Sequence, residues 1–171
     1  MANLTHVDLI TPERMLFSGE AEAVVLRADG ADTTFLANHM DYIAAVDVCV
    51  LRLEGVQGGE APSDDVPASG TGPAGEVAPR GVALAAVYGG FVKVADNKVT
   101  IVAGVAELAE EIDLPRAQRA LEAAEARLSA GDVAEAEAAA ARARVRIAAA
   151  VKLKADLGRL ETGAGSPRLM A

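Results

Sequence analysis

The chain has 171 residues, 51% of them hydrophobic, which is enough to bury the core of one domain or of two small ones. Aromatic residues make up only 3%, tryptophan is absent, and the formal net charge is -9. Nucleic-acid binding needs a basic face for the phosphates and aromatic platforms for the bases, so this composition argues against a nucleic-acid partner.

The first 19 residues carry His, Asp, Glu and Arg among their apolar residues, so they resemble neither a signal peptide nor a transit peptide. No run of about 18 uncharged apolar residues occurs in the chain. We therefore expect a cytoplasmic protein that reaches a membrane only through a partner. Cys49 stands alone in the apolar run VDVCVLRL, which predicts a buried, inert thiol rather than a nucleophile.

Residues 3–104 predict a β-rich half, because short segments rich in β-branched residues are bounded by Gly, Asp, Asn or Pro. The segments are 4–10, 21–28, 33–37, 42–55, 82–95 and 98–103. Within the fourth, a two-residue period sets Val46, Val48 and Val50 against Asp47, Cys49 and Leu51. The sequence ADNKV at 95–99 predicts a turn between strands. Many short strands without intervening helices indicate a small antiparallel sandwich or barrel.

Residues 55–81 differ sharply from their surroundings, because Gly, Pro, Ser and acidic residues dominate and no apolar period remains. This composition predicts a disordered acidic loop or a long hairpin inserted within the β domain. A linker between domains is the alternative. An insert is favoured because a strand pattern resumes directly after it.

From Asp113 onward the apolar period changes from two residues to 3.6. One face of a first helix carries Leu114, Ala117, Leu121, Ala124 and Leu128. Gly131 is placed to end this helix, and Asp132 followed by Glu135 forms a capping box for a second one. A connection this short predicts an antiparallel helical hairpin with an alanine-rich, weakly packed contact. Such an element can dock, extend or melt.

The second predicted helix begins acidic and ends basic, with one acid, Asp156, among six basic residues: Arg142, Arg144, Arg146, Lys152, Lys154 and Arg159. Bases near a helix C-terminus complement the helix dipole, which is sufficient to explain a solvated basic face. An acidic partner surface or a polyphosphate is the other interpretation. Arg142 and Arg146 are four residues apart, so they share a face and can close on one phosphate group.

The start of the first helix, EEIDLPRAQRAL at 110–121, has the features of an ordinary N-terminus. Asp113 is a suitable N-cap, and Pro115 fits the first turn because its missing N–H costs nothing there. Arg116 in that turn opposes the helix dipole. Its charge is therefore either tolerated or held by Glu110, Asp113 or a bound anion.

Two stretches resemble the epsilon subunit of F-type ATP synthases, called delta in mitochondria. They are VDLITPERMLFSGEAEAVVLRADGA at 7–31, with its FSG turn, and YGGFVKVADNKVTIVAGVAELAEEIDLPRAQRALEAAEARL at 88–128. The resemblance covers the chain apart from residues 55–81 and the tail after Glu161. It implies an all-β sandwich at 1–108, a regulatory helical hairpin at 109–161, and a flexible tail at 162–171.

The resemblance further implies a non-catalytic subunit of the rotor central stalk of a proton-translocating ATP synthase. The sandwich would bind the gamma subunit and the c-ring, coupling rotation of the ring to ATP synthesis. The helices would inhibit ATP hydrolysis by presenting Arg142, Arg144, Arg146, Lys152 and Lys154 to the catalytic alpha/beta hexamer. The complex would hold the chain peripherally on the cytoplasmic side of the bacterial cell membrane.

Some members of the family bind regulatory ATP through an Ile/Leu-Asp-x-x-Arg-Ala motif, here Ile112, Asp113, Arg116 and Ala117. The resemblance adds Glu107 and the pair Arg142 and Arg146 to this candidate Mg-ATP site, and no cofactor is required.

The loop that faces the c-ring in the family departs from the usual glycine- and proline-containing pattern. Its counterpart TTFLANHMDYI, which includes Asn38 and His39, keeps only a Leu and the His. An ordinary turn or core role for His39 is the competing interpretation.

Two other functions remain as alternatives. A hydrolase would need a nucleophile elbow, metal-ligand spacing or a phosphate loop, and the sequence has none of these patterns. A free-standing adaptor that senses ATP without a rotary enzyme would use the same two parts. Stoichiometric recovery with a membrane complex distinguishes the adaptor from the rotor subunit.

Overall fold

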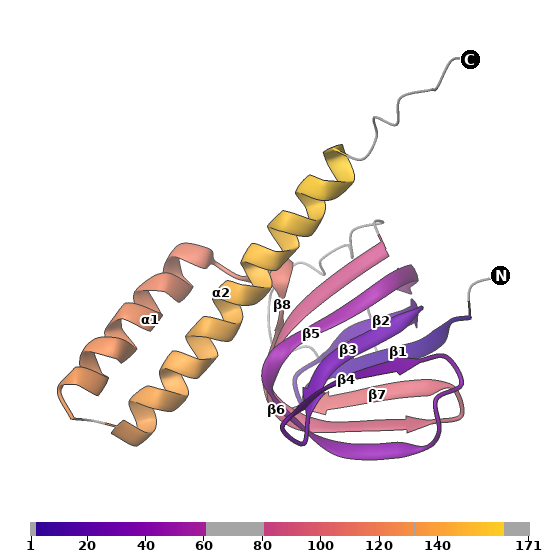
Figure 1. The fold of residues 1–171 in the computed structure, drawn as a ribbon, viewed down its shortest axis with the longest axis horizontal. Helices are drawn as coiled ribbons and strands as arrows, with labels where there is room; N and C mark the ends of the chain where they lie inside the picture. The colour runs from indigo at the N-terminus through magenta and orange to yellow at the C-terminus, as the bar shows by residue number, and fades with distance from the viewer. Residues whose placement is uncertain (1–2, 61–80, 132, 163–171) are drawn as a thin grey trace.

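A computed structural model describes residues 3–60, 81–131 and 133–162, which form a β domain and a helical hairpin (Figure 1). The strands are β1 Thr5–Ile10, β2 Met15–Ala21, β3 Ala23–Ala28, β4 Ala31–Leu36, β5 Tyr42–Glu60, β6 Gly81–Ala95, β7 Lys98–Ala103 and β8 Ala106–Leu108. A short 3-10 turn, η1 (Ala109–Glu111), leads to helices α1 (Leu114–Ser129) and α2 (Val133–Thr162).

The strands follow the order β4-β3-β5-β2-β1-β7-β6-β8, and an additional β5–β6 pairing closes the sheet on itself. All pairs are antiparallel except β1–β7, which is parallel. The predicted antiparallel sandwich is confirmed except at this pair. The reason is that a strand pattern along the chain carries no information about which distant strand becomes the neighbour.

Two predicted turns had different outcomes. Asp96 and Asn97 both have positive φ, at 51° and 57°, so the expected turn between β6 and β7 is confirmed. The FSG turn at 17–19 is wrong, because these residues lie inside β2, where Phe17 pairs with Leu9 of β1 and is 2% exposed. Burial of the phenylalanine outweighs the turn preference of Ser and Gly.

The predicted insert at 55–81 has paired strand residues at both ends, as expected for a long hairpin and not for a disordered loop. Residues 55–60 continue β5, where Glu20 of β2 pairs with Gln57, and Gly81 begins β6. The remainder of the prediction, residues 61–80, lies outside the described residues.

The alternation predicted in β5 changes phase part-way along the strand. Val46 is 4% exposed and faces the sandwich core, whereas Val48 is 41% exposed and the buried positions continue at Cys49 and Leu51. Gly90 of β6 pairs with Val46, beside this change. Its φ is 145°, and a Cβ there would come within 2.2 Å of the Val102 carbonyl oxygen, so a residue with a side chain would not fit. Close strand approach at Gly90 and a phase change in β5 thus occur at the same place.

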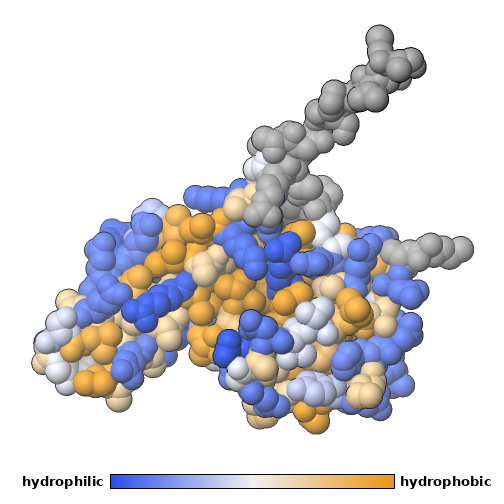
Figure 2. Space-filling model, viewed as in Figure 1, coloured by the Kyte–Doolittle hydropathy of each residue, from blue (hydrophilic) through white to orange (hydrophobic). Residues whose placement is uncertain are grey.

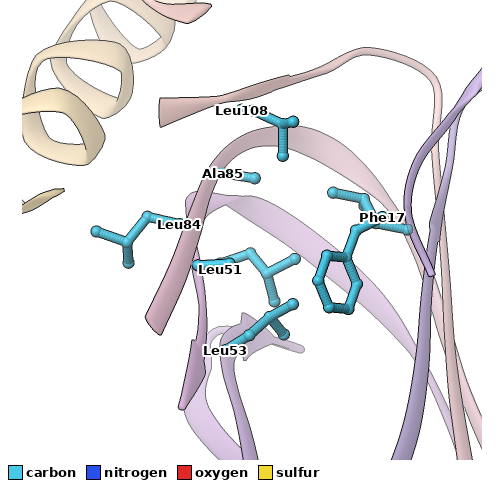
Figure 3. Close-up of a pocket in the computed structure, with 8 residues that line it drawn as sticks. Phe17, Leu51, Leu53, Leu84, Ala85 and Leu108 are labelled. Atoms are coloured by element: carbon cyan, nitrogen blue, oxygen red, sulfur yellow. The ribbon is translucent and has the colours of Figure 1, made fainter. Parts of the chain in front are cut away.

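The sandwich core is built almost entirely from aliphatic side chains of both layers. One end of it contains a small apolar cavity of about 10 Å³. Figure 3 shows Phe17, Leu51, Leu53 and Leu108 gathered there around Ala85, whose small side chain leaves the space open. Leu84, the adjacent residue of β6, points the other way, towards the helices.

The hairpin forms as predicted. Asp113 caps α1, Ala130 ends it, and Gly131 adopts the positive φ of 92° expected just after a helix. Asp132 lies outside the described residues, and α2 continues well beyond the length of α1. In Figure 1, α2 lies between α1 and the sandwich.

A second apolar cluster joins the hairpin to the outer side of β5 and β6, and we call it the docking seam. Its buried members are Leu84, Ala86, Ala109, Ile112, Ala117, Ala149, Ala150 and Leu153. Figure 2 shows apolar surface where the hairpin meets the sandwich, with hydrophilic side chains along the outer edges of the hairpin. Five of the eight buried members are alanine, so the seam buries little apolar area per residue.

Candidate functional site

The start of α1 lies against the docking seam. The Asp113 carboxylate accepts a hydrogen bond from the Arg116 backbone N–H at 3.0 Å, which satisfies one of the free donors of the helix end. Ile112 and Ala117 are 9% and 0% exposed within the seam. The Arg116 side chain is exposed. This part of the motif therefore serves as a helix cap and as packing.

Glu107 and Arg146 form the main ionic contact between β8 and α2. Arg146 Nη2 lies 2.8 Å from a Glu107 carboxylate oxygen, and its Nε donates to the same oxygen at 3.0 Å. Both side chains are about three-quarters buried, at 25% and 28% exposed. Burial, together with the nearby Glu107, raises the pKa of Tyr88 of β6, while Arg146 and Arg142 act in the opposite direction.

Arg142 lies one turn before Arg146, beside a groove between α2 and the sheet. The groove has a volume of about 450 Å³ and is lined by Val48, Tyr88, Val105, Ala138, Ala141 and Arg142. Within the described residues Arg142 has no ion pair, whereas Arg146 is held by Glu107. A free guanidinium at the edge of an apolar groove can receive an anionic group.

The predicted nucleotide-binding residues fall into two groups around the docking seam. Glu107, Arg142 and Arg146 surround Tyr88 at one part of it. The beginning of α1 lies elsewhere, in a pocket of about 480 Å³ that it shares with the α2 residues Ala150, Leu153, Lys154 and Leu157. A ligand held by both groups would have to extend along α2.

The basic residues of α2 have unequal surroundings. Arg144 pairs with Glu125 of α1 at 3.1 Å, and both side chains are more than half exposed. Lys152 and Lys154 are exposed, and the described residues offer neither of them an ion pair. Arg144, Lys152 and Lys154 therefore remain accessible to a partner, whereas Arg146 is occupied within the chain.

The loop with Asn38 and His39 is held by the distant β6–β7 turn. Asn97 Oδ1 accepts from the Asn38 backbone N–H at 2.8 Å, and its Nδ2 donates to the Leu4 carbonyl oxygen at 2.8 Å. His39 packs edge-on to Phe35 with centroids 5.1 Å apart, and its Nδ1 donates to the Met40 carbonyl oxygen at 2.8 Å. Met40 is 76% exposed, so the loop tip presents apolar surface.

Three features of these sites were not predicted from the sequence. They are the bridging role of Asn97, the position of Tyr88 under α2, and an ion pair between Arg52 of β5 and Asp156 of α2. The one available signal was the single acid in the basic part of α2. Its importance depends on a partner 104 residues away, which no local pattern reveals.

No group of three or more His, Cys, Asp or Glu side chains is arranged to hold a metal ion among the described residues. Neither described helix combines the length and the apolar character needed to cross a membrane.

Comparison with known proteins identifies the family. Residues 4–62 match the model of the ATP synthase Delta/Epsilon chain beta-sandwich domain. A Streptomyces griseus protein named ATP synthase epsilon chain is 33% identical over 124 residues, covering 72% of this chain and 82% of that protein. The chain belongs to the ATP synthase epsilon chain family. As a member, it is a subunit of ATP synthase, which is a membrane-associated complex.

A second epsilon chain, from Desulforudis audaxviator, is 37% identical over 133 residues, covering 77% of this chain and 80% of that protein. Among solved structures, a chain in the Euglena gracilis mitochondrial ATP synthase OSCP/F1/c-ring assembly matches with a TM-score of 0.54 and 20% identity. That match covers 91% of this chain and 82% of the other. It supports the predicted fold of a sandwich followed by two helices.

Proposed function

We propose that this epsilon-family chain is a non-catalytic rotor subunit of a proton-translocating ATP synthase. The sandwich attaches to the gamma subunit and the c-ring, and so helps to couple rotation of the ring to ATP synthesis. The Euglena gracilis assembly that contains a similar fold is an F1/c-ring complex, which supports this placement. The chain would lie peripherally on the cytoplasmic side of the cell membrane.

The hairpin in this proposal restrains ATP hydrolysis. The observation that carries this part is the set of exposed basic side chains on α2, Arg144, Lys152 and Lys154, on an element attached through a thin alanine-rich seam. A weakly attached basic helix can leave the sandwich and bind an acidic surface of the alpha/beta hexamer. Arg146 becomes available to the same surface once the Glu107 contact opens, and joins Arg142 there.

The test is ATP hydrolysis by the assembled enzyme. A triple variant, Arg144→Gln, Lys152→Gln and Lys154→Gln, should raise the hydrolysis rate severalfold, because each lost charge weakens the contact. The matched control keeps all three charges as Arg144→Lys, Lys152→Arg and Lys154→Arg and should behave as wild type. Equal rates in all three enzymes would remove the inhibitory role while leaving the structural one.

We also propose regulatory ATP as a ligand of the docked hairpin, with no cofactor required for the structural role. Arg142 is unpaired among the described residues and shares a helix face with Arg146, which supports an anion site there. The triphosphate would compete with Glu107 for Arg146, and Asp113, Arg116, Ile112 and Ala117 would form the far end of the site.

Calorimetric titration of the full chain with Mg-ATP tests this second proposal. The Arg142→Ala, Arg146→Ala double variant and Arg116→Ala should each weaken binding at least tenfold. Arg144→Ala is the control, because that side chain pairs with Glu125 on the exposed side of the hairpin. Absence of heat at millimolar ATP in the wild type would exclude the site.

A further inference from the structure

Two ion pairs join α2 to the sandwich, and their charges are arranged oppositely. In one pair α2 supplies the basic residue, and in the other it supplies the acidic residue. The first is Arg146 of α2 with Glu107 of β8, described above. The second is Arg52 of β5 with Asp156 of α2, at 3.7 Å, with side chains 24% and 10% exposed. Arg52 Nε also lies 2.8 Å from a Glu54 carboxylate oxygen, an ionic contact without the geometry of a hydrogen bond. Both pairs are shielded enough from water to be stronger than ordinary surface pairs.

The two pairs lie on opposite flanks of the apolar strip of α2. Positions 146 and 156 are separated by about 15 Å along the helix and by about 80° around it. Ala149 and Leu153 lie between them in the helical projection, and both are buried in the docking seam. The contact therefore consists of a narrow apolar strip with a charge pair at each end.

Alanine alone does not define how α2 should sit on the sheet. Two of the three buried α2 members of the docking seam, Ala149 and Ala150, have small side chains, which do little to fix the position of the helix by shape. The charges are more specific. The helix presents a base and then an acid, while the sandwich presents an acid and then a base.

A shifted or reversed helix would thus bring like charges together or leave a part-buried charge unpaired. Either outcome is costly, because a shielded charge without a partner has lost its hydration and gained nothing. Buried polar pairs that fix register at some expense in stability are known from coiled coils.

We propose that Arg52–Asp156 and Glu107–Arg146 form a two-point charge clamp that sets the register of α2 on the sandwich and holds the hairpin docked. The clamp itself is a property of the isolated chain. Its effect on ATP hydrolysis rests on the proposed inhibitory function, in which the hairpin leaves the sandwich to bind the alpha/beta hexamer.

The experiment measures backbone hydrogen exchange of residues 145–157 in the full chain, with β1 and β7 as internal references. Asp156→Arg places two guanidinium groups together and should speed exchange in this segment at least tenfold, without changing the reference strands. Adding Arg52→Asp restores opposite charges and should return most of the protection. Glu137→Arg, an equal charge reversal at an exposed position of α2, should have no effect.

Unchanged hydrogen exchange of residues 145–157 in Asp156→Arg would overturn the clamp. Exchange as fast in the double variant as in the single one would also overturn it. A general loss of protection in Asp156→Arg that includes β1 and β7 and is not rescued would also overturn it. Hydrolysis by the assembled enzyme separates the two proposals. Faster exchange with an unchanged hydrolysis rate would support the clamp and remove the inhibitory role of the hairpin.

Discussion

At the scale of single residues, Asn97 connects three segments that are far apart in the sequence. Its backbone carbonyl accepts from the Thr5 hydroxyl at 2.9 Å and from the His6 backbone N–H at 3.1 Å. Its side chain holds Asn38 and Leu4 as described above. A residue that is nominally part of a two-residue turn thus fixes both the start of the chain and the loop expected to face the c-ring.

Replacing Asn97 with glycine tests this bridging role. Asn97→Gly keeps the positive φ but removes both side-chain hydrogen bonds, so the free energy of unfolding should fall by about 1–3 kcal/mol. Asp96→Gly is the matched control, because Asp96 has a similar φ without these bonds, and it should be neutral or slightly stabilising. Urea denaturation measures the free energy of unfolding of both variants. Equal changes in the two would show that the side-chain bonds of Asn97 do not contribute to stability.

Asp8 of β1 is 5% exposed and contacts Lys98 at 2.6 Å, Ser18 at 2.8 Å and His6 at 3.0 Å. Burial alone would raise its pKa, but the bonds from Lys98 and Ser18 lower it further than burial raises it, so the net shift is below the usual 3.8. The folded state thus favours the ionised carboxylate. This stabilisation is present above the unfolded pKa and is lost as the pH falls through the lower folded value.

Asp8→Asn should therefore reduce the free energy of unfolding by about 1–2 kcal/mol at pH 7, with a smaller difference from wild type below about pH 4. Urea titrations between pH 3 and 7 measure this change. Asp41→Asn, at an exposed residue without an ion pair in the described structure, is the control and should show little pH-dependent difference. A constant deficit for Asp8→Asn at every pH would mean that charge is not the cause.

At the scale of the elements, β6 is buried on both sides over residues 83–87. Ala83, Ala85 and Val87 face the sandwich core, while Leu84 and Ala86 face the hairpin. This explains why the segment VALAAVY is continuously apolar rather than alternating. The strand belongs to two cores at once, and changes on its two sides should have separate consequences.

A pair of leucine truncations should separate these cores. Leu51→Ala enlarges the cavity beside Ala85 and should lower the free energy of unfolding of the sandwich by about 2–5 kcal/mol. Leu153→Ala of α2 thins the docking seam and should speed hydrogen exchange in the hairpin, with little effect on unfolding of the sandwich. Calorimetry and hydrogen exchange are measured on both variants. If each variant destabilised the sandwich and the hairpin together, the two would form a single cooperative unit.

At the scale of the whole molecule, a stable sandwich carries a hairpin attached mainly through α2. The sandwich has a closed sheet and a core of large aliphatic side chains, whereas the seam depends on alanine and two ion pairs. The difference in packing predicts that the hairpin opens at a lower free energy than the sandwich unfolds. Such a hierarchy suits a subunit with a fixed attachment and a movable regulator.

Deleting residues 114–171 tests this division of roles in the assembled enzyme. The remaining sandwich should still assemble, and ATP hydrolysis should rise, because the proposed inhibitory helices are gone. Since the deletion also exposes Leu84, the same deletion with Leu84→Ser controls for adhesion through the uncovered seam. Loss of assembly in both would place the stalk contact in the hairpin instead.

The sequence by itself determined the features that depend on neighbouring residues. The two-residue and 3.6-residue periods, the Asp96–Asn97 turn and the caps at Asp113 and Gly131 all act within a few positions, so a local pattern was sufficient. The motif resemblance identified the family for the same reason. The parallel β1–β7 pair, the burial of Phe17 within β2 and the strand pairing of residues 55–60 could not be predicted in this way.

Only the tertiary structure decided how the candidate site is assembled. It paired Arg146 with Glu107 and Arg52 with Asp156, left Arg142 beside a groove, and buried Ile112 and Ala117 as packing residues. The physical reason is that ion pairs and hydrophobic clusters depend on distance in space. Here the partners are 39 and 104 positions apart, and the closed sheet brings them together.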